Sequence, residues 1–131
     1  MKMEEYSVKL AGQNLDIEKL ICLLPKLSIT LIWPKGEQFS LQNGKQYKNH
    51  SGIPNSTNIV MFESTFREFF EFLLYIESNY VAMTDLGVSD IEVWALMFRS
   101  GQINGELSTR EVKLLAAIDA SYCWSAVVED E

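Results

Sequence analysis

The fold is decided by the stretch from Val88 to Glu129, VSDIEVWALMFRSGQINGELSTREVKLLAAIDASYCWSAVVE. Apolar residues dominate both faces of residues 91–98, as in an interior strand that is covered on both sides. Ser108 precedes Glu111 by three positions, which is the spacing of a capping box at the start of a helix. Residues 120–128 return to period two, so the stretch predicts a strand, a helix and a second strand parallel to the first.

The predicted helix after Ser108 has one apolar face. Its members, at helical spacing, are Val112, Leu115, Ala116 and Ile118. Charged residues occupy positions between them and can stay in water. We therefore expect this helix to lie on the sheet through its apolar face.

The opening third of the chain repeats this order of elements. Residues 5–11 and 27–33 alternate apolar with polar side chains, which predicts two strands. Between them Asp16 is placed to cap a short apolar helix, and Pro25 ends that helix. The two thirds share this architecture without a matching side-chain repeat.

The middle of the chain begins with its least regular region. Residues 34–56 are rich in Gly, Pro, Asn and Ser, so we expect a loop there. Asn43 and Gly44 are the residue types of a tight hairpin turn. A further short strand is expected over residues 58–62.

The longest predicted helix follows this strand. Thr65 and Glu68 have the capping-box spacing, and phenylalanine and leucine residues follow at helical spacing. The helix is expected to end within residues 79–87. We expect it to cover the face of the sheet that carries Trp94.

Length and composition favour one domain of the α+β class. The 131 residues suit a single domain over residues 1–131, and 47% of them are apolar. No run approaches the roughly 20 apolar residues of a membrane helix, and the opening MKMEEYSV contains no export signal, so we expect a cytoplasmic protein without membrane contact. We predict a mixed sheet of about five strands with three helices, built from two strand-helix-strand units, for which ferredoxin-like packing is one arrangement.

The charge balance is the most informative bulk property. The chain has 18 acidic and 11 basic residues, which give a formal net charge of −7. The basic residues are scattered without a stripe, so the sequence does not favour nucleic acid as a partner. An acidic surface attracts basic proteins, although acidity can also serve solubility alone.

No residue set specifies a reaction. His50 is the single histidine and lies in a polar loop, so a Ser or Cys nucleophile has one base at most to pair with. No nucleophile elbow surrounds Ser7, Ser100 or Ser125. We therefore expect no catalytic residues, no metal and no cofactor.

Two groups of acidic residues are candidates for binding. Asp85, Asp90 and Glu92 lie close in sequence but lack the alternating oxygen ligands of a calcium loop. Glu68 and Glu71 share one helix face, which is either an acidic docking stripe or the wet side of an amphipathic helix.

For the tryptophans and cysteines, a structural role is a simpler interpretation than a functional one. Trp33, Trp94 and Trp124 all fall in strand patterns, where a core position is more common than a ligand platform. Cys22 and Cys123 are far apart and lack metal or redox spacing, so we expect two buried thiols.

Two segments carry a resemblance to a known family. The turn WPKGE at 33–37 and the closing run NGELSTREVKLLAAIDASYCWSAVVE resemble a bacterial family of small domains of unknown function. Such domains are similar in size and charge to immunity proteins encoded beside bacterial toxins, including those of contact-dependent growth inhibition. The resemblance implies a non-enzymatic immunity protein that binds a cognate basic toxin domain. The acidic contacts expected for it are Glu68, Glu71, Asp85, Asp90 and Glu92.

Two other functions stay open at this point. One is a small-molecule-binding or regulatory domain without catalytic activity, using the sheet face or the loop over 34–56. A deep apolar pocket containing Trp33 or Tyr47 would favour it. The other is a hydrolase or nuclease, which turnover of a substrate would reveal.

Overall fold

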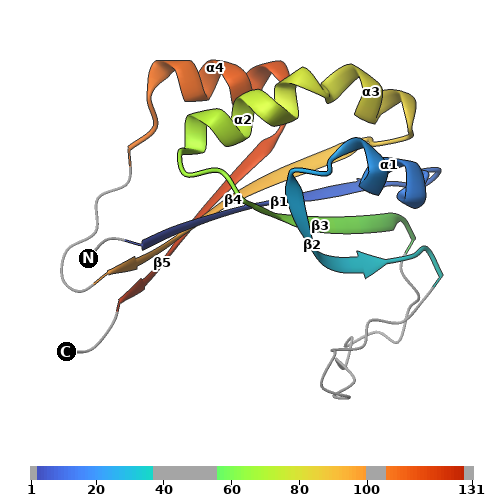
Figure 1. Ribbon diagram of the computed structural model, residues 1–131, viewed down its shortest axis with the longest axis horizontal. Coiled ribbons are helices and arrows are strands. Elements are labelled where there is room, and N and C mark those ends of the chain that lie inside the picture. The colour runs from blue at the N-terminus through green and yellow to red at the C-terminus, as the bar shows by residue number, and fades with distance from the viewer. Residues whose placement is uncertain (1–2, 37–55, 100–105, 129–131) are drawn as a thin grey trace.

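The protein has two layers, a five-stranded sheet and a layer of helices (Figure 1). The structure is a computed structural model that describes residues 3–36, 56–99 and 106–128. The strands in these residues are β1 (Met3–Gly12), β2 (Leu27–Trp33), β3 (Asn58–Ser64), β4 (Asp90–Arg99) and β5 (Ser121–Val128). The helices in the same residues are α1 (Ile17–Leu23), α2 (Phe69–Ser78), α3 (Tyr80–Asp85) and α4 (Thr109–Ala117). The predicted α+β class with a mixed five-stranded sheet is confirmed, with one helix more than expected.

The strand order is β2-β3-β1-β4-β5. β1 is antiparallel to both β3 and β4, β2 is antiparallel to β3, and β5 is parallel to β4. From β1 to β4 the chain therefore follows the β-α-β-β-α-β arrangement of a ferredoxin-like fold, with α2 and α3 in the place of the second helix. α4 and β5 extend this unit at the β4 edge. The parallel closing unit is confirmed, whereas in the opening unit β3 lies between the two strands.

The core lies between the sheet and the helices, which all cover the same face (Figure 1). Val8 on β1 pairs with Val93 on β4, and both are fully buried. Phe62 on β3 pairs with Val8 from the other side and is fully buried as well. From α2, Phe72 and Leu73 pack into this cluster. The register thus directs alternate residues of three adjacent strands against the helices.

The expected cover over Trp94 is wrong. Trp94 pairs with Ser7 and lies on the face of β4 opposite to Val93, so α2 does not lie over it. The interior position of β4, between β1 and β5, is confirmed. Val93 and Ala95 take the helix side because the register sets them beside the buried residues of β1.

Two predicted helix caps are confirmed by their hydrogen bonds. The Asp16 side chain accepts from the backbone N–H of Lys19 at 3.1 Å and begins α1. At α4 the Ser108 hydroxyl accepts from the Glu111 N–H at 3.2 Å, and the Glu111 carboxylate accepts from the Ser108 N–H at 2.8 Å. This reciprocal pair satisfies backbone donors that the first turn leaves free.

The predicted start of α2 at Thr65 is wrong, because α2 begins at Phe69. The Thr65 hydroxyl donates to the backbone carbonyl of Lys26, which lies far back in the sequence. The Ser64 hydroxyl accepts from the Phe66 N–H at 2.9 Å and holds a turn after β3. These bonds keep Thr65 out of a helix cap, so the helix begins one turn later.

The predicted buried face of α4 is partly wrong. Leu115 and Ile118 are buried as expected, but Val112 is 50% exposed and Ala116 is exposed too. Leu114 packs against the core instead. Turning the helix toward its two leucines buries more apolar area than Val112 and Ala116 would.

Among the described residues, no helix is long and apolar enough to span a membrane. The expected hairpin at Asn43 and Gly44 lies outside the described residues. So do His50, Tyr47 and Ser100.

Candidate functional site

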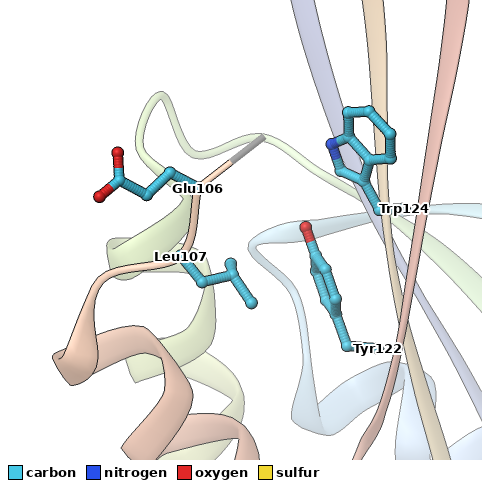
Figure 2. A pocket seen from close by; sticks show the side chains of 4 residues that line it. All are labelled: Glu106, Leu107, Tyr122 and Trp124. Carbon is cyan, nitrogen blue, oxygen red and sulfur yellow. The ribbon is translucent and has the colours of Figure 1, made fainter. Parts of the chain in front are cut away.

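A hollow of about 340 Å³ lies between β5 and the segment that leads into α4 (Figure 2). Its described lining residues are Glu106, Leu107, Tyr122 and Trp124. Tyr122 and Trp124 share the helix-facing side of β5 because successive strand residues alternate between faces. β5 is the last strand of the sheet in the described part of the chain, so this hollow lies at an edge of the molecule.

The two aromatic rings of the hollow are held in place by neighbours. The indole N–H of Trp124 donates to the sulfur of Met97 at 3.3 Å, while the side chain remains 41% exposed. The Tyr122 ring packs against Phe69, with the ring centroids 5.8 Å apart. Phe69 in turn packs against Tyr6, at 4.7 Å between centroids. The core therefore fixes both rings, and Trp124 retains a surface open to a partner.

The other wall of the hollow is positioned by the capping box of α4. Leu107 directly precedes the cap residue Ser108, and its side chain points toward Tyr122 (Figure 2). Glu106 lies at the rim with its carboxylate pointing outward into solvent (Figure 2). Among the described residues Glu106 takes part in no ion pair. The hollow thus combines apolar surface with a negative charge at its edge, a combination suited to binding.

Two of the predicted acidic contacts lie at the same end of the molecule as the hollow. Glu68 is the cap residue of α2 and Glu71 lies in its first turn, and both side chains are exposed. Phe69, the residue after Glu68, contacts Tyr122. The start of α2 is therefore adjacent to the wall of the hollow.

The other three predicted contacts lie elsewhere. Asp85 ends α3 and Asp90 begins β4, and both are exposed. Asp90 precedes Ala95, the residue paired with Trp124, by five positions on β4, or roughly 17 Å of strand. Glu92 lies on the sheet face away from the helices. The five residues do not form one cluster, and the described residues contain no group of three or more His, Cys, Asp or Glu that could hold a metal.

Glu92 belongs to a polar row on the helix-free face of the sheet. It pairs across strands with Lys9 on one side, and the Cys123 thiol contacts its carboxylate at 3.8 Å on the other. Desolvation raises the pKa of Cys123, and the negative charge of Glu92 raises this pKa further, against a smaller opposite effect of Lys9. The expectation of two buried thiols is wrong, because Cys22 is exposed and Cys123 is half-buried.

The charges of Glu92 and Lys9 are expected to control the reactivity of the Cys123 thiol. In a Cys22→Ser background, Glu92→Gln removes the charge that disfavours the Cys123 thiolate. The pKa of Cys123 then falls, and its reaction with a disulfide reagent at pH 8 becomes faster. Lys9→Met is the opposite control, since it removes a charge that favours the thiolate and should slow the reaction. Equal rates in all three proteins would show that these charges do not act on the thiol.

The expected core positions of the tryptophans hold only in part. Trp33 and Trp94 are half-buried, whereas Trp124 is 41% exposed. No sequence pattern marked Glu106 or Leu107 as a binding residue. Both residues directly precede a helix cap that the sequence predicts. The cap alone does not show which strand lies opposite these two residues.

Comparison of the chain with protein-family models, with curated proteins and with solved structures finds no match.

Proposed function

We propose that this protein is a non-enzymatic immunity protein that acts in the bacterial cytoplasm by binding and neutralising a cognate basic toxin domain. The observation that carries the proposal is a surplus of exposed carboxylates. The formal net charge is −7, and the ion pair found among the described residues joins Asp16 and Lys19 at 4.0 Å. Most acidic groups of the described surface therefore remain available to an external cation.

The five acidic residues proposed as contacts are expected to contribute unequally to binding. Glu68 and Glu71 lie beside the hollow, where exposed aromatic surface can anchor a partner. Asp85 and Asp90 lie at the other end and contribute to the long-range attraction of a basic protein. Glu92 is half-buried and already contacts Cys123, so we assign it the smallest contribution.

A rescue experiment tests the proposed function. The probe is the C-terminal domain of the polypeptide that the neighbouring gene encodes, expressed alone and together with this protein. Expression of the domain alone should stop growth, and co-expression of the immunity protein should restore growth. Toxicity that persists on co-expression, with no complex between the purified proteins, would contradict the proposal.

The charge contribution gives a quantitative prediction. Reversal of all five acidic residues to lysine should raise the Kd for the toxin domain about thirtyfold, since exposed charge contacts contribute about 0.2–1 kcal/mol each. The Kd of the unchanged protein should rise with salt because screening weakens such contacts. Calorimetric titration at two salt concentrations measures both effects. An unchanged Kd after all five reversals rules out these residues as contacts.

The hollow favours a second candidate function, a small-molecule-binding or regulatory domain. Its volume of about 340 Å³ lies at the lower end of ligand pockets, which span about 300–1,000 Å³. Trp33, which was expected in such a pocket, is not among its described lining residues. A metabolite that raises the Tm of this protein but not that of a Trp124→Ala variant would favour this function over the first.

A further inference from the structure

We propose that the hollow lined by Tyr122, Trp124, Leu107 and Glu106 receives an arginine side chain of a basic protein partner. The proposal rests on the proposed function for the source of that arginine. The hollow supplies the chemistry that would recognise it, namely a fixed aromatic face and, at the rim, Glu106, whose carboxylate points away from the rings in Figure 2 and would turn toward the bound arginine.

The aromatic face comes from Trp124. Its indole ring is held by the N–H bond to Met97 at 3.3 Å, so it loses little freedom when a ligand arrives. Tryptophan is the strongest aromatic partner for cations, and a guanidinium group can stack flat on its ring. With 41% of its surface exposed, Trp124 offers that face without rearrangement of the core.

The negative charge comes from Glu106. Arg110, in the first turn of α4, could have neutralised this rim, but it stacks over the Phe70 ring at 4.1 Å from the centroid. Glu106 therefore stays without an ion pair among the described residues, and its exposed side chain can turn toward a bound cation. Glu68, beside the wall of the hollow, adds to the local negative potential.

These features favour arginine over other occupants. A neutral ligand would make no use of the carboxylate at the rim. Lysine is a compact charge that binds water strongly, whereas the planar guanidinium can stack on the indole and donate two parallel hydrogen bonds to one carboxylate. No further strand covers β5 in the described part of the chain, so a partner segment can approach the hollow from the sheet edge.

The test uses N-acetyl-arginine methylamide as the probe and the matching citrulline amide as its neutral analogue. The signals of the indole N–H groups are followed by NMR in the full chain, and Trp124→Phe assigns the Trp124 signal. The arginine probe should shift the Trp124 signal in a saturable manner. The Trp94 signal, from the opposite face of the sheet, should stay in place, and the citrulline probe should bind at least about fivefold more weakly.

Matched charge variants complete the test. Glu106→Gln should weaken arginine binding about fivefold, whereas Glu77→Gln, an equal charge change on the exposed side of α2, should leave it unchanged. Equal binding of the two probes, equal effects of the two variants, or no shift at Trp124 would each overturn the proposal. If the toxin domain binds with salt dependence while arginine does not shift Trp124, this inference fails and the proposed function stands. If arginine binds as described but no toxin is neutralised, the site stands and the proposed function fails.

Discussion

Gly87→Ala is expected to lower the free energy of unfolding by about 3 kcal/mol or more. Two effects combine at this position. Gly87 has a φ of +105°, a conformation that side chains with a Cβ rarely adopt. A Cβ there would also lie 2.7 Å from the backbone carbonyl oxygen of Asn14, and backbone cannot move aside as a flexible side chain can.

Gly12 makes a second close approach, to Gly87 itself, and should be equally intolerant of a side chain. A Cβ on Gly12 would lie 1.9 Å from the carbonyl oxygen of Gly87. The end of β1 and the turn before β4 therefore approach each other through two glycines. Replacing either one forces apart the segments that set the β1–β4 register.

Gly36 provides the matched control. Its φ is +87°, but a Cβ there would meet nothing within 4 Å. Gly36→Ala should therefore cost about 1–2 kcal/mol, from backbone strain alone. Urea unfolding followed by circular dichroism measures all three variants. If Gly87→Ala costs no more than Gly36→Ala, the close backbone approach contributes nothing to stability.

Phe72→Ala is expected to destabilise the protein by about 3–5 kcal/mol. Phe72 belongs to α2 and is fully buried. Its ring centroid lies 6.3 Å from that of Tyr6 and 6.4 Å from that of Phe69. Truncation removes this contact area and leaves a cavity that a closely packed core fills only in part.

Leu74→Ala on the same helix is the control for Phe72→Ala. Leu74 is 38% exposed, so its truncation should cost about 1 kcal/mol and leave no enclosed cavity. Both variants introduce alanine, the best helix former, so neither loses stability through a lower helix propensity. A similar loss in both would mean that Phe72 does not lie in a tightly packed core.

Local sequence patterns were sufficient to predict much of the fold. The caps at Asp16 and Ser108 depend on residues three positions apart, so the sequence alone predicts them. The start of α2 could not be predicted in this way. Thr65 bonds to the carbonyl of Lys26, 39 residues away, and that contact competes with the local capping pattern.

Features that depend on how distant strands pair could not be predicted from the sequence. Insertion of β3 between β1 and β2 follows from pairing over long sequence distances. The orientation of Trp94 depends on the register with β1, and a shift of one residue reverses the face.

The candidate site could be predicted only in fragments. The alternation of β5 places Tyr122 and Trp124 on one face, but the exposure of Trp124 depends on where the helices end. Glu106 reaches the hollow because the cap of α4 lies opposite β5. Of the predicted acidic contacts, Glu68 and Glu71 lie at this end of the molecule, which only the packing of Phe69 on Tyr122 reveals.

The most direct test of our central claim is a comparison of two double charge reversals by calorimetric titration with the toxin domain. Glu68→Lys with Glu71→Lys changes the end that carries the hollow, and Asp85→Lys with Asp90→Lys changes the other end by the same net charge. If a basic toxin domain docks beside the hollow, the first pair should raise the Kd about tenfold more than the second. Equal effects of the two pairs would contradict this location, and an unchanged Kd in both would contradict electrostatic docking itself.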